Sequence, residues 1–284
     1  MKIITAPDAI QNYRSKNREK SFGLVPTMGF LHDGHLSLIR RARAENETVG
    51  VSLFVNPAQF NDQSDLENYP RNTEQDLNLL RDAGVDLVWM PREEDVYPDG
   101  FKTVVIVSEL NSILEGASRP NHFDGVTTIV AKLFNVFQPD KAYFGQKDAQ
   151  QVRIIQQLVL DLNYNLELII CPTVRERDGL AMSSRNANLS TEGRKQAACV
   201  YQALKYAKEH LQKGGDDIGL LKEMLTGMIH ENSRATVDYI SIASCDTLLE
   251  ISTMEKDMLV SLAVYIDDVR LIDNMIVKMD SNSA

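Results

Sequence analysis

Two histidines that lie three positions apart are the side chains of this sequence best suited to chemistry. His32 and His35 are two of only five histidines, and Gly29 and Gly34 lie beside them in the segment PTMGFLHDGH, residues 26–35. An apolar run precedes this segment and a helix-spaced apolar pattern follows it, so we expect a strand-to-helix turn. A helix N-terminus offers backbone N–H groups and a partial positive charge, which suit phosphate. The segment therefore predicts a phosphate site that both histidines face.

Other interpretations of this segment fit its residues less well. The glycine spacing equals that of a Walker A loop, but His35 and Leu36 stand where that loop needs Lys and Ser or Thr. A zinc site is disfavoured because no Cys or Glu partner lies at the spacing of zinc enzymes. A Cys–His nucleophile pair is disfavoured because no cysteine occupies a strand-to-helix turn. The simplest alternative is a helix cap with two surface histidines.

A pair of amides follows the next predicted strand. Asn56 and Gln59 lie in the segment FVNPAQF. Neutral amides donate and accept hydrogen bonds, so they can orient hydroxyl groups and a carboxylate without adding charge. The alternative is an ordinary Asn-Pro turn.

A third strand–turn–helix pattern contains a lysine in the segment YFGQKDAQQ. Gly145 permits close approach of the backbone, and Lys147 lies near the helix start, where the helix dipole does not favour a cation. We therefore interpret Lys147 as a phosphate ligand; a solvated lysine on a surface turn is the alternative. Asp148 could cap the helix or bind ribose, and Gln151 is expected on the same helix face as Lys147.

The polar segment at residues 173–186 places two hydroxyl groups beside a guanidinium. Ser183, Ser184 and Arg185 are consecutive there. Such groups on a mobile loop can close over a triphosphate, whereas the alternative is a solvated linker. Outside these segments, His122 precedes an amphipathic helical pattern and could wall a pocket, while His210 and His230 lie in helical patterns and are expected at the surface.

The elements that must position these groups alternate between strand and helix up to about residue 172. Such alternation predicts a Rossmann-like α/β domain with a parallel sheet and helices on both faces. Beyond it, two helical patterns near residues 192–212 and 216–232 precede strand-like runs at 236–243 and 258–266, which indicates a smaller α+β domain. We place the domains at residues 1–175 and 176–284, and expect residues 280–284 to form a frayed tail.

Composition narrows the class of protein further. The 284 residues are 43% hydrophobic and 25% charged, with 30 Lys and Arg against 40 Asp and Glu, a formal net charge of −10. This acidity disfavours a nucleic-acid partner. The N-terminus lacks a signal-peptide pattern, and the apolar runs are far shorter than the roughly 20 residues that span a bilayer. Three scattered cysteines are typical of reduced thiols, so we expect a cytoplasmic protein without a membrane partner.

Seven segments in order resemble the pantothenate synthetase (pantoate–β-alanine ligase) family, and the His-x-Gly-His spacing resembles its nucleotidyltransferase superfamily. Besides those quoted above, the matching segments are YPRN, RPNHFDGV, DGLAMSSRN and, near the end, RLIDN at residues 270–274. The resemblance covers essentially the whole chain. It implies a Rossmann-like N-terminal domain, a C-terminal lid domain and a homodimer. It also implies ligation of pantoate to β-alanine through pantoyl adenylate, with AMP and pyrophosphate released.

The resemblance also assigns roles to individual positions. The implied ATP-binding residues are Met28, Gly29, Phe30, Leu31, His32, Asp33, Gly34, His35, Gly145, Gln146, Lys147, Asp148, Val174, Met182, Ser183, Ser184 and Arg185. The implied catalytic residues among them are His32, His35, Lys147, Ser183, Ser184 and Arg185, with His35 in the place of the family's proton donor. Gln59 and Gln151 match its pantoate-binding glutamines, and we add Asn56. Mg²⁺ is expected with ATP, and Asp76 is our choice of ligand.

Two positions depart from the family, and two other functions stay open. Many members have Glu where Gln146 stands and Leu where Met182 stands, which affects only fine contacts because the lysine and both serines are present. A nucleotidyltransferase of this kind could instead leave a nucleotide in its product or charge a tRNA, although the acidity disfavours tRNA. A non-catalytic nucleotide-binding protein would be expected to have lost a phosphate-facing group, and all of them are present.

Overall fold

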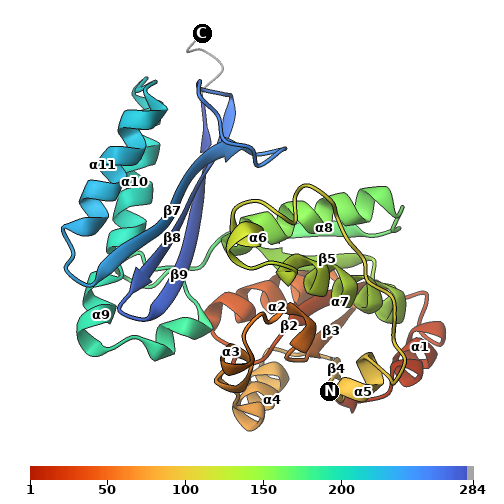
Figure 1. Cartoon of the computed structure of the whole chain (residues 1–284). Helices are drawn as coiled ribbons and strands as arrows, with labels where there is room; N and C mark the ends of the chain where they lie inside the picture. Colours follow the sequence, from red (N-terminus) through yellow and green to blue (C-terminus); the bar gives the residue numbers. More distant parts are fainter. Residues whose placement is uncertain (280–284) are drawn as a thin grey trace. The chain divides into compact units, whose positions relative to one another are not determined.

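The computed structural model describes residues 1–279, and the expected tail at 280–284 lies outside the described residues. The chain divides into two compact units (Figure 1). The first unit comprises Met1–Gln146 and Gln151–Pro172, and the second comprises Lys147–Gln150 and the chain from Thr173 onward. No helix within residues 1–279 is both long and apolar enough to cross a membrane.

The first unit is built on a parallel sheet of six strands in the order β1-β4-β3-β2-β5-β6. The strands are β1 (Lys2–Ile4), β2 (Phe22–Thr27), β3 (Thr48–Leu53), β4 (Leu87–Trp89), β5 (Lys141–Gly145) and β6 (Glu167–Cys171). The central strands are almost entirely buried, as expected for a parallel sheet covered on both faces. The α/β class predicted from the sequence is therefore confirmed.

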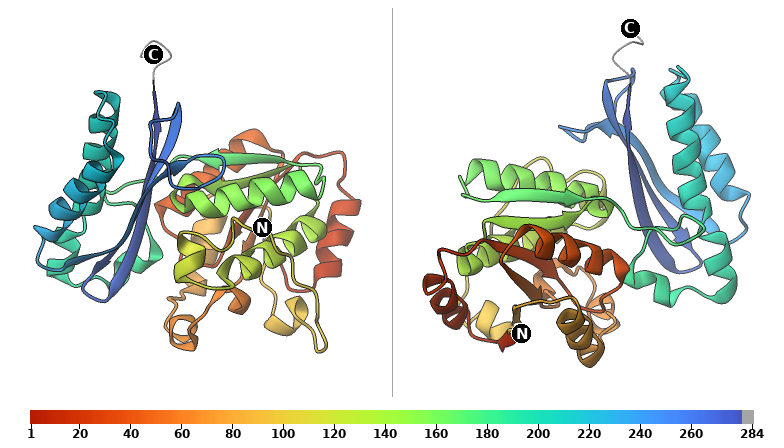
Figure 2. Two further views of the ribbon diagram at one scale, coloured as in Figure 1. Left: turned by 45° about the horizontal axis from the view of Figure 1, so that its top comes forward. Right: turned by 180° about the vertical axis from the view of Figure 1, so that it is seen from behind.

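Helices cover both faces of this sheet. The helices of this unit are α1 (Pro7–Ser15), α2 (Asp33–Glu45), α3 (Gln63–Glu67), α4 (Thr73–Asp82), α5 (Glu93–Val96), α6 (Glu115–Ser118), α7 (His122–Phe137) and α8 (Ala149–Asp161), with the 3-10 turns η1 (Pro57–Gln59) and η2 (Gln146–Asp148). The two views of Figure 2 show α2 on one face and α7 and α8 on the other. This division follows from right-handed crossovers, because strands are added on either side of β2.

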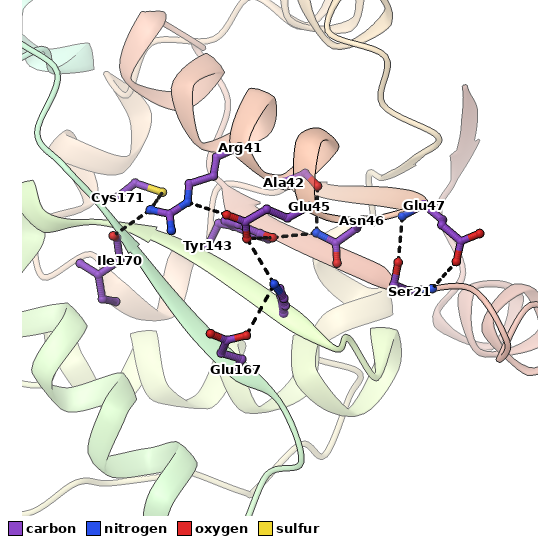
Figure 3. Close-up of polar contacts among 11 residues, drawn as sticks. Ser21, Arg41, Ala42, Glu45, Asn46, Glu47, Tyr143, Glu167, Ile170 and Cys171 are labelled. Carbon is purple, nitrogen blue, oxygen red and sulfur yellow. Dashed lines mark hydrogen bonds and ion pairs between the residues drawn. The ribbon is translucent and has the colours of Figure 1, made fainter.

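A polar network fixes the C-terminal half of α2 to β5 and β6 (Figure 3). The buried Tyr143 hydroxyl donates to Glu45 Oε2 at 2.9 Å and accepts from Asn46 Nδ2 at 2.7 Å. Glu45 also pairs with Arg41 and Lys141 at 3.0 and 3.4 Å. The hydrogen bond from Arg41 is the main reason that the pKa of Glu45 lies below its usual value. The network therefore holds the helix whose N-terminus follows β2.

The second unit is an antiparallel sheet with helices packed on one face. Its elements are η3 (Ser184–Asn188), α9 (Thr191–Gln196), α10 (Cys199–Gln212), α11 (Ile218–His230), β7 (Ala235–Ser244), β8 (Asp257–Ile266) and β9 (Val269–Lys278). The strand order is β7-β8-β9, and the core side chains of β8, among them Leu262 and Val264, pack with those of α10 and α11. The smaller α+β fold is confirmed.

The structure differs from the sequence-based elements in three places. The single helix expected at 192–212 is two helices, because Ala197 and Ala198 have ψ angles near −20°, closer to 3-10 than to α geometry. Strand β1 and helix α1 were missed, since a strand of three residues is too short to show a period and only Ile10 and Arg14 of α1 are buried. Strand β9 was not located, because the sequence pattern left open whether two or three strands follow the helices.

Candidate active site

The histidine segment at residues 26–35 forms the turn between β2 and α2, as the sequence predicts. Gly29 has φ of +86° and Phe30 has φ of +51°, a conformation that non-glycine residues rarely adopt. The carboxylate of Asp76, in the first turn of α4, accepts from the N–H groups of Phe30 and Leu31, both at 2.8 Å. Asp76 is only 3% exposed. This carboxylate therefore stabilises the strained turn from a neighbouring element.

The two histidines cap the helix that the turn begins. His32 is the N-cap residue of α2, and its Nδ1 accepts from the Gly34 N–H at 3.1 Å. His35 Nδ1 accepts from the His32 N–H at 3.4 Å, which completes a reciprocal capping box. The rings lie 4.1 Å apart between centroids. Because each Nδ1 accepts a backbone N–H, the N–H of a neutral ring lies on Nε2, the side that is proposed below to face phosphate.

The amide pair lies at the end of β3 and is tightly held. Asn56 Nδ2 donates to Gln59 Oε1 at 3.0 Å and to Gly125 O at 3.1 Å. Asn56 Oδ1 accepts from the Tyr97 hydroxyl at 2.7 Å, and Gln59 Nε2 donates to Met28 Sδ at 3.1 Å. The amides are thus oriented so that Gln59 presents its N–H₂ group on the side of the β2–α2 turn.

Helix α7 supports the backbone of the same amide pair. A Cβ atom placed on Gly125 would lie 2.2 Å from Ala58 O, so only glycine allows η1 to approach α7 this closely. His122, whose role the sequence left open, is buried, and its Nδ1 lies 2.7 Å from Gln59 O while its Nε2 lies 3.2 Å from Arg119 Nη1. His122 therefore braces the main chain that carries Gln59.

The lysine segment follows β5 in the chain, and its residues fall in both units. Gly145 and Gln146 belong to the first unit, as does Gln151 in α8, whereas Lys147 and Asp148 belong to the second. Lys147 Nζ lies 3.7 Å from Asp148 Oδ1. Lys147 O accepts a hydrogen bond from Asn274 Nδ2 at 2.8 Å. The turn that carries this lysine is therefore fastened to β9.

The polar segment after β6 is folded back on itself. Arg175 and Ala181 form an antiparallel bridge, and the Met182 N–H donates to Val174 O at 3.0 Å. Ser183 then caps η3, accepting from the Arg185 N–H at 3.3 Å, and Ser184 is buried. Ser183, Ser184 and Arg185, which the sequence predicts to bind a triphosphate, thus lie at the start of a short 3-10 turn that follows a hairpin.

Metal binding has one candidate carboxylate. Among residues 1–279, no cluster of three or more His, Cys, Asp or Glu side chains is arranged to hold a metal ion. Mg²⁺ usually keeps several waters and takes one or two carboxylates with substrate phosphates. Each Asp76 oxygen already accepts one backbone N–H, and a carboxylate retains further lone pairs. Asp76 can therefore offer one coordination position beside the histidine turn, and its role as an Mg²⁺ ligand stays a prediction.

The structure thus assembles the predicted residues in two groups. In the first unit, the turn at Met28–His35 lies with Asn56, Gln59 and Asp76, linked by the contacts given above. In the second, Lys147 and the segment leading to Ser183–Arg185 are both attached to β9. Sequence reasoning missed Tyr97, Gly125 and Arg175, because their importance depends on contacts between distant parts of the chain. Residues 119–126 and 270–274 lie in segments that resemble the family, and His122 alone among them was given a possible role from the sequence.

Comparison with known proteins gives one consistent result. The family model described as Pantoate-beta-alanine ligase matches residues 2–276. The pantothenate synthetase of Caldicellulosiruptor bescii is 49% identical over 263 residues, 93% of each chain. The crystal structure of pantothenate synthetase from Thermus thermophilus has a TM-score of 0.91 at 41% identity, covering 97% of this chain and 99% of that one. The pantoate-beta-alanine ligase of Francisella tularensis, complexed with beta-gamma ATP and beta-alanine, has a TM-score of 0.81 at 37% identity over 97% of both chains.

Proposed function

Since the chain belongs to the pantoate–β-alanine ligase family, we propose that it condenses pantoate with β-alanine and converts ATP to AMP and pyrophosphate. The observation that carries this proposal is the family match over residues 2–276. The turn between β2 and α2 supports it, because two capping histidines lie there at the carboxyl end of a parallel strand. Ligands of open α/β sheets bind at this edge.

Two chemical steps account for the products. A carboxylate oxygen of pantoate attacks the α-phosphorus of ATP, the bond to the bridging oxygen breaks, and pyrophosphate leaves with that electron pair. The neutral amine of β-alanine then attacks the acyl carbon of pantoyl adenylate, AMP leaves and the amine loses a proton. The enzyme forms no covalent bond to either substrate. Its task is to hold two anions in reacting positions and to stabilise the charge that develops on phosphate.

The residues at the N-terminus of α2 suit the phosphate part of this task. His32 and His35 can donate from Nε2, and the helix adds its N–H groups and dipole. Lys147, Ser183, Ser184 and Arg185 supply further cations and donors, and we assign them to the phosphates as well. We also assign ATP contacts to Gly145–Asp148, Val174 and Met182. A Cβ atom on Gly145 would meet no atom within 4 Å, so space for a ligand lies beside that backbone.

Pantoate is assigned to the neutral amides. Asn56 fixes the Gln59 carboxamide so that its N–H₂ group is available to a carboxylate or hydroxyl oxygen. Gln151 is assigned to the same substrate. Mg²⁺, when bound with ATP, neutralises part of the phosphate charge, and Asp76 is the proposed protein ligand. Neutral amides bind pantoate without repelling ATP or competing for the cation.

The domain roles and the assembly belong to the same proposal. Residues 1–175 form the domain that binds ATP and pantoate, residues 176–284 form the lid, and the protein works in the cytoplasm as a homodimer. We propose that Val104 and Ile106, which are 60% and 54% exposed, contribute apolar side chains to the dimer interface. Both flank Val105, whose N–H donates to Thr128 Oγ1 at 3.0 Å on α7. Light scattering should give twice the mass of the chain, and a Val104→Asp, Ile106→Asp variant should shift towards monomer.

A turnover assay with ATP, pantoate and β-alanine tests the reaction. We expect AMP and pyrophosphate to appear in equal amounts, with AMP formation dependent on β-alanine. AMP release that ignores β-alanine would exclude the ligase. A product that retains the nucleotide would favour the adenylyltransferase alternative.

Two substitutions test the phosphate-binding roles. Gln is the ordinary capping-box residue at the position of His35, so His35→Gln can keep the helix cap while it removes the imidazole. We expect His35→Gln and Lys147→Ala to lower kcat by roughly 10²–10³-fold, as for other lost charge-stabilising donors. His230→Ala and Lys205→Ala, on exposed positions of α11 and α10, are the controls. Near-normal kcat in either test variant, with unchanged melting temperature, would remove that residue from the mechanism.

A further inference from the structure

Two consecutive polar residues of β9 are buried in the second unit without a role in the proposed chemistry. Asp273 and Asn274 are 4% and 5% exposed. Burying polar groups is unfavourable unless they find hydrogen-bond partners. The hydrogen-bond partners of Asp273 and Asn274 therefore indicate which segments these two side chains hold in place.

Asp273 binds the hairpin that leads to Ser183. Its carboxylate pairs with Arg175 through two bonds, Nη1 to Oδ2 at 2.5 Å and Nη2 to Oδ1 at 3.1 Å. The Arg175 guanidinium also lies over the ring of Tyr201, 4.5 Å from its centroid, and donates to Gly179 O at 3.0 Å. Burial raises the pKa of Asp273, and the hydrogen bond from Arg175 opposes this effect. A bidentate, partly buried ion pair of this kind fixes the relative position of its two side chains as well as stabilising the fold.

Asn274 binds the turn that carries Lys147. Its Nδ2 donates to Lys147 O at 2.8 Å. Register explains why neighbouring residues serve two segments, because consecutive side chains of a strand point to opposite faces. Leu271 and Val277, which share the face of Asp273, belong to the core beneath the helices, whereas Asn274 lies on the other face. The edge strand β9 is thus able to hold one segment on each face.

We propose that Asp273 and Asn274 are positioning residues for ATP, which place the Ser183–Arg185 turn and Lys147 at a fixed distance from each other. This inference rests on the proposed function, in which both segments bind phosphate. Asn274 fixes the backbone of Lys147 directly, and Asp273 fixes the hairpin through Arg175. Ordering both segments before ATP arrives avoids an entropic cost of binding.

Two variants test the two attachments separately. Asn274→Ala removes the side-chain bond to Lys147 O. Arg175→Met combined with Asp273→Asn removes the ion pair without leaving a buried charge unpaired, which a single substitution would do. Asn232→Ala is the control for the first, since it removes a side-chain bond to Met228 O at the end of α11. Asp238→Asn is the control for the second, since it breaks the pair with Arg270 in the same sheet.

The measurements are ATP affinity by calorimetry without other substrates, KM for each substrate, kcat and melting temperature. We expect both test variants to raise the ATP dissociation constant and KM by about tenfold, the effect of losing one charge-assisted or buried hydrogen bond. KM for pantoate should change less than about twofold, because Asn56 and Gln59 lie in the first unit. The controls should change melting temperature at most.

The possible outcomes separate this inference from the proposed function. Wild-type ATP affinity in both folded test variants would overturn the positioning role, as would equal changes in KM for ATP and pantoate. A lower melting temperature with normal ATP affinity, measured below the transition, would show a purely structural role and would also overturn it. If the wild-type protein binds ATP but does not consume pantoate, the proposed function fails, and the calorimetric comparison still decides the positioning role.

Discussion

At the scale of single residues, the Tyr97 hydroxyl and the Gly125 carbonyl together orient the proposed pantoate site. The Tyr97 hydroxyl donates to Asn56 Oδ1 and Gly125 O accepts from Asn56 Nδ2, so Asn56 turns its N–H₂ group towards Gln59 Oε1. Gln59 is then left with its own N–H₂ group, which donates to the thioether of Met28. Sulfur is a weak acceptor, so a substrate oxygen would replace it favourably. Burial raises the pKa of Tyr97, which keeps its hydroxyl protonated throughout the physiological range.

The Tyr97→Phe variant should therefore weaken pantoate binding more than ATP binding. Without the hydroxyl, Asn56 keeps only its bond to Gly125 O to orient its amide against Gln59, and we expect KM for pantoate to rise about five- to tenfold. The loss of one hydrogen bond should lower the free energy of unfolding by about 1 kcal/mol. Steady-state kinetics and urea unfolding measure the two effects. Tyr265→Phe, at an exposed ring of β8, is the control. An unchanged KM for pantoate would contradict the orienting role.

Residue types and spacing predicted the histidine turn because its geometry is local. His32 and His35 belong to one capping box, which four consecutive residues define. Tyr97 could not be found in this way, since it contacts Asn56 across 41 positions and has no pattern of its own. Asp76 was selected as a metal ligand, whereas the structure shows that it also supports the Phe30 backbone, a role that depends on tertiary packing.

At the scale of elements, the hairpin before η3 is held by a second arginine. Arg194 of α9 pairs with Glu176 and Asp178, each at 2.5 Å. The sequence indicated only a polar loop here, because neither ion pairs nor the Arg175–Ala181 bridge follow from local propensity. By contrast, most of α7 was predicted, since its apolar side chains recur at helical spacing from Val126 to Phe137.

The pKa of Asp178 should report this attachment. The hydrogen bond from Arg194 holds the pKa of Asp178 below its usual value. A carboxyl group whose pKa is lower in the folded than in the unfolded chain stabilises the folded state at pH values above its unfolded pKa of about 3.9. This contribution is lost as the pH falls through the lower pKa of the folded state. We therefore expect the hairpin to stay attached at neutral pH and to loosen only below about pH 4.

Carboxyl-carbon NMR titration tests this expectation. Arg194→Gln should raise the pKa of Asp178 towards its ordinary value, because it removes the donor to the carboxylate. Lys195→Gln is the control, since Lys195 is the next residue of α9 and pairs with Glu192 instead. A pKa of Asp178 that is the same in wild type and Arg194→Gln would show that the ion pair does not persist in solution.

At the scale of the whole molecule, the sequence predicted the class of each unit but not its strand order. The order β1-β4-β3-β2-β5-β6 depends on pairing between segments far apart, such as β2 with β5, which the apolar pattern of either strand does not encode. Composition, in contrast, indicated which partners are disfavoured without any knowledge of the fold. With 40 acidic and 30 basic residues, the chain carries a net negative charge that repels polyanions in general.

This charge should let the protein distinguish two kinds of polyanion. Tripolyphosphate can bind the few cations and hydrogen-bond donors that we assign to ATP. We therefore expect tripolyphosphate to compete with ATP and to raise the KM for ATP. A nucleic acid needs a broad basic surface, which a chain of net charge −10 opposes. Transfer RNA at the same phosphate concentration should therefore leave turnover unchanged, even at about 50 mM salt, where such binding is strongest.

Inhibition by tRNA that weakens as salt rises would reveal a local basic surface and revive the tRNA-charging alternative. Failure of tripolyphosphate to compete would show instead that the assigned cations do not form a phosphate site.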